Sequence, residues 1–443
     1  MKSSVSNRSI WNIACPIIFG NMAQTVISFT DTAFLGHIGG VELGASMMSG
    51  IYYFVFATLA WGFAVGVQII IARRLGERRL GRIGIVFDHG LICVAFIAAA
   101  MFAVLHFGTG RMLGGVIESD SIRAAAMQYM GYRHYGIIFA CFNFLFRSLY
   151  VGLSDTRPIT YSTLLMAVVN ITLDYGLIFG RLGLPQLGVG GAALASVCAE
   201  ASALVFFAVF SVVRLPLAQY SLFRFSGFDS GLMREICRLS FPTMAQRLVS
   251  FGIWFAFFVM IEGMGEVPIA VSGLVRSVYM VITIPVFAFA ATANTVTSRI
   301  IGEGRPDEVM PTLMRIMRNS LCLVVPLVAV CALIPHYTIS IFTDDAELAA
   351  ASVPVVYVLC AATLTMTFGM VFFEAVSGTG STTAALWLET SVLAVYLTYM
   401  WLQTKVWCNA IHWVWTAEIV YGTLIGIISY VFVRRGTWRS RKV

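Results

Sequence analysis

The chain has 443 residues, of which 59% are hydrophobic and only 12% are charged, and its mean hydropathy is +0.85. Soluble domains carry roughly 25% charged residues, and a chain with so few charges could not cover a soluble core of this size. The composition therefore excludes a soluble protein and predicts an integral membrane protein. A net charge of +7 must then be explained either by the membrane surface or by a nucleic-acid partner.

Long apolar segments follow one another along the whole chain. A membrane-spanning helix needs about 20 mostly apolar residues. The apolar segments are this long and do not alternate between polar and apolar residues, which predicts helices rather than a β-barrel. The first segment starts at Ile10 and continues past residue 30, which favours a retained span over a signal peptide. The twelve predicted spans lie near 10–35, 45–71, 84–107, 124–151, 158–180, 188–213, 237–261, 268–298, 315–342, 349–377, 383–404 and 411–433.

The basic residues between the spans are unevenly distributed. Twelve spans place both ends of the chain on one side of the membrane, and that side holds 21 Lys and Arg residues. The other side holds only Arg111, Arg123, Arg181 and Lys405. The positive-inside rule then predicts a multi-pass protein of the inner (plasma) membrane with both termini in the cytoplasm. Topology and lipid headgroups explain the net charge, so no nucleic acid is required.

The sequence also repeats itself at an offset of 226 residues, from Pro16 to Pro242. Because each repeat contains six spans, an even number, the two halves should have the same orientation. We therefore expect an all-α protein with two pseudo-symmetric six-helix bundles around a central cavity, 1–213 and 237–443, joined by a cytoplasmic linker, 214–236. Further matching pairs are Gly39 and Gly265, Ser46 and Ser272, Arg73 and Arg299, Gly76 and Gly302, Glu77 and Glu303, Arg79 and Arg305, and Gly152 and Gly378.

The first span carries a stripe of polar residues. Asn21, Gln24, Ser28 and Asp31 are spaced by three, four and three residues, so they share one helical face. Pro16 lies in the same span and should bend it. Burying an ionisable group in a span costs several kcal/mol. The stripe should therefore face a water-filled cavity or other helices, and Asp31 is expected to have a functional role.

Span 5 supplies a partner for this stripe. Asn170 and Asp174 are four residues apart and share a face. At ~1.5 Å per residue, Asp31, Asp174 and Ser196 of span 6 all fall in the outer half of the membrane. Carboxylate, amide and hydroxyl oxygens suit Na⁺, whereas two close carboxylates can instead share a proton. We therefore predict a coupling-ion site at Asp31, Asn170, Asp174 and Ser196, with Na⁺ possible at the first three. The sequence does not choose between H⁺ and Na⁺ as the coupling ion.

Other charged residues inside the spans have two interpretations each. Glu200 is a candidate for proton or substrate contact, or for a buried ion pair. Arg247 and Arg276 are candidates for binding anionic substrate groups, or for pairing with helix carbonyls or a carboxylate. Charges near the predicted cytoplasmic ends fit a gate salt bridge or snorkelling, and Arg133 and His134 are expected to be structural. The charges at these ends are Arg147, Glu374 and Glu389.

The two halves differ in their acidic residues. The positions 226 residues after Asp31 and Asp174 are Phe257 and Met400, neither of which is acidic. Coupling is therefore expected to depend on the N-terminal bundle alone.

No pattern typical of an enzyme or a metal centre is present. The nine cysteines are scattered without a CxxC pair or a nearby histidine at ligand spacing, so they are expected to be free, buried thiols. The sequence has no phosphate-binding loop and no nucleophile elbow. It therefore predicts a protein that is not an enzyme and that has no cofactor other than its coupling ion.

Four segments together resemble a known family: Pro16 with DTAFLGHIGG from Asp31, GLSDTRP at 152–158, NITLDYGLIFG at 170–180, and GVGGAALAS at 188–196. Over nearly its whole length the chain resembles the multidrug and toxic compound extrusion (MATE) transporters, and it looks closest to their DNA-damage-inducible protein F branch. The resemblance implies that Asp31 carries the coupling proton or helps to bind Na⁺. It also implies that the matched positions Asn170, Asp174 and Ser196 complete that site.

The expected function is a secondary antiporter that exports drugs or other amphiphilic organic compounds in exchange for H⁺ or Na⁺ by alternating access. The alternative is a lipid-linked oligosaccharide flippase of the same superfamily, which would favour several arginines in the N-terminal cavity that the spans there do not offer. A channel is opposed by the two-fold repeat and the lone carboxylate site. The expected partners are small amphiphilic substrates and the bilayer, without nucleic acid, and the protein is expected to be a monomer.

Overall fold

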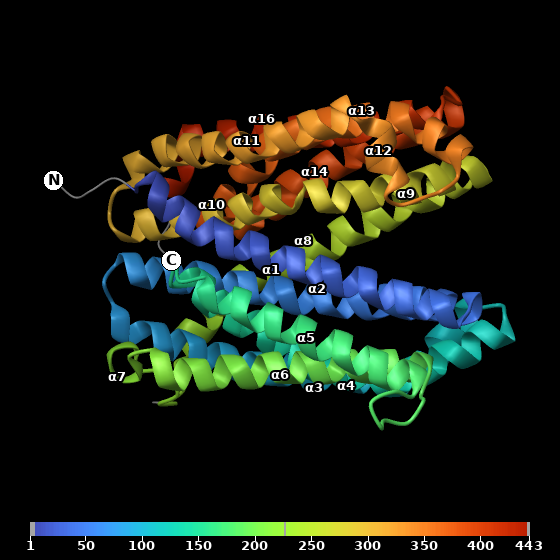
Figure 1. Cartoon of the computed structure of the whole chain (residues 1–443). Coiled ribbons are helices and arrows are strands. Elements are labelled where there is room, and N and C mark those ends of the chain that lie inside the picture. The colour runs from blue at the N-terminus through green and yellow to red at the C-terminus, as the bar shows by residue number, and fades with distance from the viewer. Residues whose placement is uncertain (1–4, 226, 441–443) are drawn as a thin grey trace. The chain divides into compact units, whose positions relative to one another are not determined.

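The computed structural model describes residues 5–225 and 227–440, and its regular secondary structure over these residues is entirely helical (Figure 1). Twelve of the described helices are long and apolar enough to cross a membrane. The prediction of an all-α protein with twelve spans is therefore confirmed.

The first half of the chain forms seven helices whose ends follow from local chemistry. Ser119 caps the start of α4 by accepting a hydrogen bond from the Ile122 amide. Gly180, at φ +66°, ends α5 in the left-handed conformation that glycine adopts without strain. The helices are α1 Asn7–Ile38, α2 Gly40–Gly76, α3 Leu80–Val116, α4 Asp120–Gly152, α5 Arg157–Phe179, α6 Val189–Arg214 and α7 Leu217–Tyr220.

The second half is more interrupted than the sequence predicts. The span expected near 268–298 is broken at Thr283, and the span expected near 315–342 stops at Leu333. Pro285 and Pro335 follow these breaks, and a proline lacks the N–H that would continue the helical hydrogen bonds. The elements are α8 Ser230–Glu262, α9 Glu266–Ile282, α10 Ile284–Gly302, η1 Pro306–Glu308, α11 Val309–Leu333, α12 Pro335–Ser340, α13 Ala346–Gly378, α14 Thr382–Trp401, η2 Leu402–Val406, α15 Ile411–Val414, α16 Thr416–Arg435 and η3 Thr437–Ser440.

The chain divides into two compact units. Of the described residues, those in 19–71 and 79–244 form the N-terminal unit, and those in 1–18, 72–78 and 245–443 form the C-terminal unit. A division at 214–236 was expected from the sequence, but here the linker and the start of α8 belong to the N-terminal unit. Helices α1 and α8 change unit after Ile18 and Met244, each two residues beyond its repeat-matched proline.

The repeated Arg-x-x-Gly segments pack against each other inside the C-terminal unit. A Cβ atom on Gly76 would clash with the Arg299 carbonyl oxygen, and one on Gly302 would clash with the Arg73 carbonyl oxygen. The two contacts are reciprocal, which is the pattern that a local two-fold relation produces. The repeat therefore preserves glycines where two backbones must touch.

A second repeated contact occurs once within each unit. A Cβ atom on Gly152 would lie 3.2 Å from the Gln68 carbonyl oxygen, and one on Gly378 would clash with the carbonyl oxygen of Asn294. Gln68 and Asn294 are themselves 226 residues apart (294 − 68). The two units therefore share a packing scheme as well as a sequence pattern.

The segment between α6 and α8 is held on α3. Asp88 accepts hydrogen bonds from the amides of Phe223 and Phe225, both at 3.0 Å, and His89 Nε2 accepts one from the Asp229 amide at 2.9 Å. The Asp229 side chain in turn caps α8, and its hydrogen bonds with the backbone N–H groups of Leu232 and Gly231 hold the pKa of Asp229 below its ordinary value. The linker is thus fixed to the N-terminal unit by buried polar groups.

Candidate functional site

Asp31 of α1 meets Asn170 and Asp174 of α5 inside the N-terminal unit. The carboxyl groups of Asp31 and Asp174 lie within hydrogen-bonding distance of each other. With its amide nitrogen turned toward them, Asn170 donates to Asp31 Oδ1 at 2.9 Å and to Asp174 Oδ2 at 3.3 Å. Asp174 is fully buried and Asn170 is 1% exposed. Two carboxyl groups this close require a shared proton or a bound cation, because two buried negative charges would repel each other.

The unsatisfied Oδ1 atom of Asp174 is a second indication of a shared proton or a bound cation. Asp174 Oδ1 receives no hydrogen bond from any donor of the described chain. Buried polar atoms are almost always hydrogen-bonded in proteins. A proton held between Asp31 and Asp174 would satisfy such an oxygen, and so would a small cation.

An apolar cluster lies one helical turn beyond the carboxyl pair. Leu35 lies one turn beyond Asp31 on α1, and Ile178 lies one turn beyond Asp174 on α5. Together with Val189 and Ala192 they form a buried core cluster. Gly191 allows α6 to approach α5 closely, since a Cβ there would lie 2.6 Å from the Leu177 carbonyl oxygen. Each of the two carboxyl-bearing helices thus contributes to this apolar core one turn beyond its carboxyl group.

The rest of the polar stripe on α1 is bound at its far end and open in the middle. Arg147 Nη2 of α4 donates to Asn21 Oδ1 at 2.9 Å. Gln24 and Ser28 are exposed, and the Ser28 hydroxyl donates to the Gln24 carbonyl oxygen at 3.2 Å. The structure therefore places Arg147 against the stripe, where the sequence suggested a gate salt bridge or snorkelling.

Ser196 is the one predicted site residue that the structure does not join to this group. It is half-buried on α6, and no hydrogen bond links it to Asp31, Asn170 or Asp174 among the described residues. Its place in the coupling-ion site stays a prediction.

Glu200, one turn further along α6, forms a buried ion pair with Arg133 of α4. The two Arg133–Glu200 contacts measure 2.9 and 2.6 Å, and the side chains are 11% and 16% exposed. The guanidinium also lies 3.7 Å from the ring centroid of Tyr53, a favourable cation–π contact. Gly136 leaves room for the pair, because a Cβ there would clash with Arg133 Nη1. Arg133 is close enough to Asp31 to interact with its charge.

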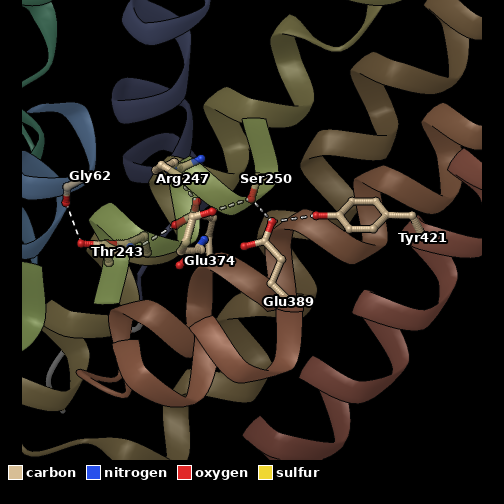
Figure 2. A network of polar contacts seen from close by, with 9 residues as sticks. Gly62, Thr243, Arg247, Ser250, Glu374, Glu389 and Tyr421 are labelled. Carbon is tan, nitrogen blue, oxygen red and sulfur yellow. Dashed lines mark hydrogen bonds and ion pairs between the residues drawn. The ribbon is translucent and has the colours of Figure 1, made fainter. Parts of the chain in front are cut away.

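The C-terminal unit holds two acidic residues, Glu374 and Glu389, inside polar networks, whereas the sequence suggested charges near the cytoplasmic helix ends (Figure 2). Glu374 accepts from Arg247 at 2.9 Å and from the Asn294 amide at 3.1 Å. Glu389 is 4% exposed, and its Oε1 accepts from the hydroxyls of Ser250 at 2.7 Å and Tyr421 at 3.0 Å. Snorkelling toward a helix end is therefore wrong for Glu389, because its partners hold it inside the protein.

Glu418 and Arg276 are two further charged residues of the C-terminal unit that lie inside predicted spans. Glu418 of α16 accepts hydrogen bonds from Tyr279 at 3.1 Å and Tyr396 at 2.8 Å. The sequence reading did not single out Glu418, although an acidic residue within an otherwise apolar span is the signal that could have found it. Arg276 lies over the rings of Trp254 and Phe258, at 5.2 and 5.5 Å from their centroids. These aromatic rings are its neighbours among the described residues, and its part in binding anionic substrate groups stays a prediction.

No group of three or more His, Cys, Asp or Glu side chains suited to a metal ion occurs in the described part of the chain. A sodium ion at the predicted position would use the carboxyl oxygens of Asp31 and Asp174 and the amide oxygen of Asn170. That requires the Asn170 amide to turn its oxygen, rather than its nitrogen, toward the two carboxyl groups.

Comparison with known protein families matches MatE over residues 16–176 and again over 242–400. The chain belongs to the MatE family. The two matched regions begin at the repeat-matched prolines, so each half of this MatE protein is one copy of the family's unit. The resemblance to MATE transporters is therefore confirmed, whereas the assignment to the DNA-damage-inducible protein F branch stays a prediction.

Curated relatives include probable multidrug resistance proteins NorM. One from Agrobacterium fabrum is 27% identical over 269 residues, covering 59% of this chain and 56% of that protein, so the chain matches only just over half of its length. One from Thermotoga maritima is 23% identical over 453 aligned positions, covering 98% and 94%.

Solved structures support the same fold. An outward-facing multidrug resistance MATE family transporter of the MOP superfamily has a TM-score of 0.89 at 19% identity, covering 97% of this chain and 95% of that one. A MOP superfamily transporter from Pyrococcus furiosus has a TM-score of 0.88 at 18% identity, covering 98% and 97%. This MatE protein therefore has the fold of these transporters.

Proposed function

We propose that the protein is a proton-coupled antiporter that exports amphiphilic organic compounds, and that Asp31 and Asp174 hold the coupling proton. The observation that carries this proposal is that the buried carboxyl group of Asp174 and the half-buried one of Asp31 lie within hydrogen-bonding distance, with Asn170 between them. Such a pair binds a proton reversibly, because one proton removes the repulsion between the two charges. The multidrug resistance names of the relatives support organic compounds as the exported class.

A proton and a sodium ion would require opposite orientations of the Asn170 amide. With its nitrogen toward Asp31 and Asp174, the orientation assigned from hydrogen bonding, the amide donates to both carboxyl groups. A sodium ion would need the amide oxygen in the place of that nitrogen, because Na⁺ binds oxygen atoms. A proton can join and leave the carboxyl pair while the amide stays as it is.

The flippase alternative receives no support from the arginines of α4. A lipid-linked phosphate would be recognised by guanidinium groups free to bind it. Arg133 is held by Glu200 through two hydrogen bonds, and Arg147 donates to Asn21. Both guanidinium groups are therefore already engaged with the protein, which favours the export of organic compounds.

We also propose that both termini lie in the cytoplasm, on the strength of the 21 basic residues on the side that holds them. A reporter that fluoresces only in the cytoplasm, fused to the C-terminus, should be bright. A dark fusion at normal expression, together with an active periplasmic reporter at the same position, would reverse this orientation.

Dye efflux from vesicles tests the coupling directly. The purified protein is reconstituted, and a pH gradient and a sodium gradient are imposed in separate experiments. We expect the pH gradient alone to drive dye movement and to be dissipated by added dye. Transport driven by the sodium gradient alone at equal pH would replace the proton with sodium, and insensitivity to both gradients would contradict ion-coupled antiport.

A further inference from the structure

Glu389 is a buried acidic side chain to which no basic residue of the described chain is hydrogen-bonded. It lies two turns into α14 and is 4% exposed. Its Oε1 atom interacts with the hydroxyls of Ser250 and Tyr421, at 2.7 and 3.0 Å, as Figure 2 shows. Its Oε2 atom has no hydrogen-bond partner among the described residues. An ionised carboxylate would leave that oxygen charged, buried and unsatisfied, which is costly.

The surrounding charged groups do not neutralise Glu389. Arg247 of α8 and Glu374 of α13 both act on it electrostatically, with opposite signs, and they form an ion pair with each other at 2.9 Å. From α16, Tyr421 donates to it, while Glu418 is bound to Tyr279 and to Tyr396 of α14. A charged Glu389 would therefore add a net negative charge to the interior of this unit.

Ser250 is placed to serve Glu389 in either protonation state. Its single hydroxyl hydrogen has two acceptors in reach, the Gln246 carbonyl oxygen at 2.8 Å and Glu389 Oε1 at 2.7 Å. When Glu389 is ionised, the hydroxyl can donate to the carboxylate. When Glu389 carries a proton on Oε1, that proton can be donated to Ser250 Oγ while the hydroxyl donates to Gln246. Both states thus form without movement of the backbone.

We propose that Glu389 is a second proton-binding site, separate from the Asp31–Asp174 pair and located in the C-terminal unit. It binds its proton on Oε1, against Ser250, and leaves Oε2 as a neutral carbonyl oxygen. The proton is exchanged during the transport cycle, a part of the inference that rests on the proposed antiport function. For each exported molecule, the protein then imports one proton more than it would through the Asp31–Asp174 pair alone.

Infrared difference spectroscopy of the full-length protein in detergent tests the binding site without transport. On a step from high to low pH, we expect a carbonyl band of a buried carboxylic acid that is lost in Glu389→Gln. Ser250→Ala should keep this band and shift its frequency, because the acid loses its hydrogen-bond acceptor. Glu347→Gln, at an exposed position in the first turn of α13, serves as the control and should leave the band unchanged.

The ratio of protons to dye in reconstituted vesicles tests the use of this proton. We expect Glu389→Gln to lower the ratio by one and Ser250→Ala to leave it unchanged. A wild-type spectrum whose acid bands all survive Glu389→Gln would overturn the proposed site, and an unchanged ratio in that variant would overturn its role in transport. Asp31→Asn separates the two proposals, since the Glu389 band should survive in it even if the antiport proposal fails.

Discussion

In the N-terminal unit two carboxyl groups meet directly, with an amide between them. In the C-terminal unit, by contrast, Glu374 lies beside Arg247, while Glu389 and Glu418 lie among hydroxyl groups. The units nevertheless share a repeat and its glycine contacts. At the positions equivalent to Asp31 and Asp174, the C-terminal unit has Phe257 and Met400, which are 1% and 0% exposed. At these positions the second half of the repeat therefore has larger, buried apolar side chains in place of the two carboxyl groups.

This difference separates two uses of a buried carboxyl group. One that meets another carboxyl group gains or loses an ion easily, because the unbound state is repulsive. One that is paired with arginine is held in a single state by that charge. The comparison predicts that loss of function and loss of stability will follow different residues.

The largest effect is expected from Asp31→Asn. The variant should lose coupled efflux, a decrease on the order of 100-fold, while it remains folded and inserted. The amide occupies the same volume but cannot exchange a proton. Dye efflux and drug resistance at matched expression measure the loss, and Asp120→Asn, on an exposed carboxyl at the start of α4, should behave as wild type. Resistance retained by Asp31→Asn would remove the distinction between the two units.

The next largest effect should fall on stability. Arg133→Gln leaves Glu200 buried without its partner, and breaking such a pair costs about 3–5 kcal/mol. Because the charges cancel, the double variant Arg133→Gln/Glu200→Gln should recover most of that loss. Thermal unfolding in detergent measures all three variants. If the double variant is as unstable as the single one, the pair does more than neutralise charge.

A moderate effect with a diagnostic direction is expected from Asn170→Ala. The amide N–H groups stabilise the ionised carboxyl pair, and such hydrogen bonds contribute roughly 1.5–3 kcal/mol. Their loss should make the proton harder to remove. The pH at which transport is half-maximal should therefore rise by roughly one to two units. For sodium the sign is opposite, since a lost ligand weakens ion binding. If Asn170→Ala raises the sodium concentration needed for half-maximal transport and leaves the pH dependence unchanged, sodium rather than a proton is the coupling ion.

The smallest effect should distinguish the two repeat-matched prolines. Pro16 lies on the helix that carries Asp31, and Pro242 lies on the helix that carries Phe257 instead. A proline loosens the helix around it, so Pro16→Ala should reduce severalfold the factor by which pH changes drug affinity. Pro242→Ala should change that factor less. Drug affinity in detergent between pH 5 and 9 measures it, and by linkage the drug must alter proton binding by the same factor. Equal effects of both prolines would contradict the comparison.

How far the sequence predicts the site depends on the distance between partners along the chain. Asn170 and Asp174 share a face because they are one turn apart, and the polar stripe made α1 a reasonable partner for them. The pairing of Arg133 with Glu200 crosses 67 residues, and that of Ser250 with Glu389 crosses 139. No periodicity relates such positions, so the sequence indicated that these residues were unusual without indicating what they bind.

The sequence by itself determined that this is a membrane protein with twelve helices and two related halves, because apolar length, basic-residue placement and the 226-residue offset act locally or by simple repetition. The tertiary structure alone decided which buried charges are paired and which are not. It buried Glu389 against Ser250 and Tyr421 and paired Arg147 with Asn21, and among the described residues it shows no hydrogen bond from Ser196 to the carboxyl pair. The physical reason is that burial and hydrogen bonding depend on neighbouring helices, which composition and spacing do not specify.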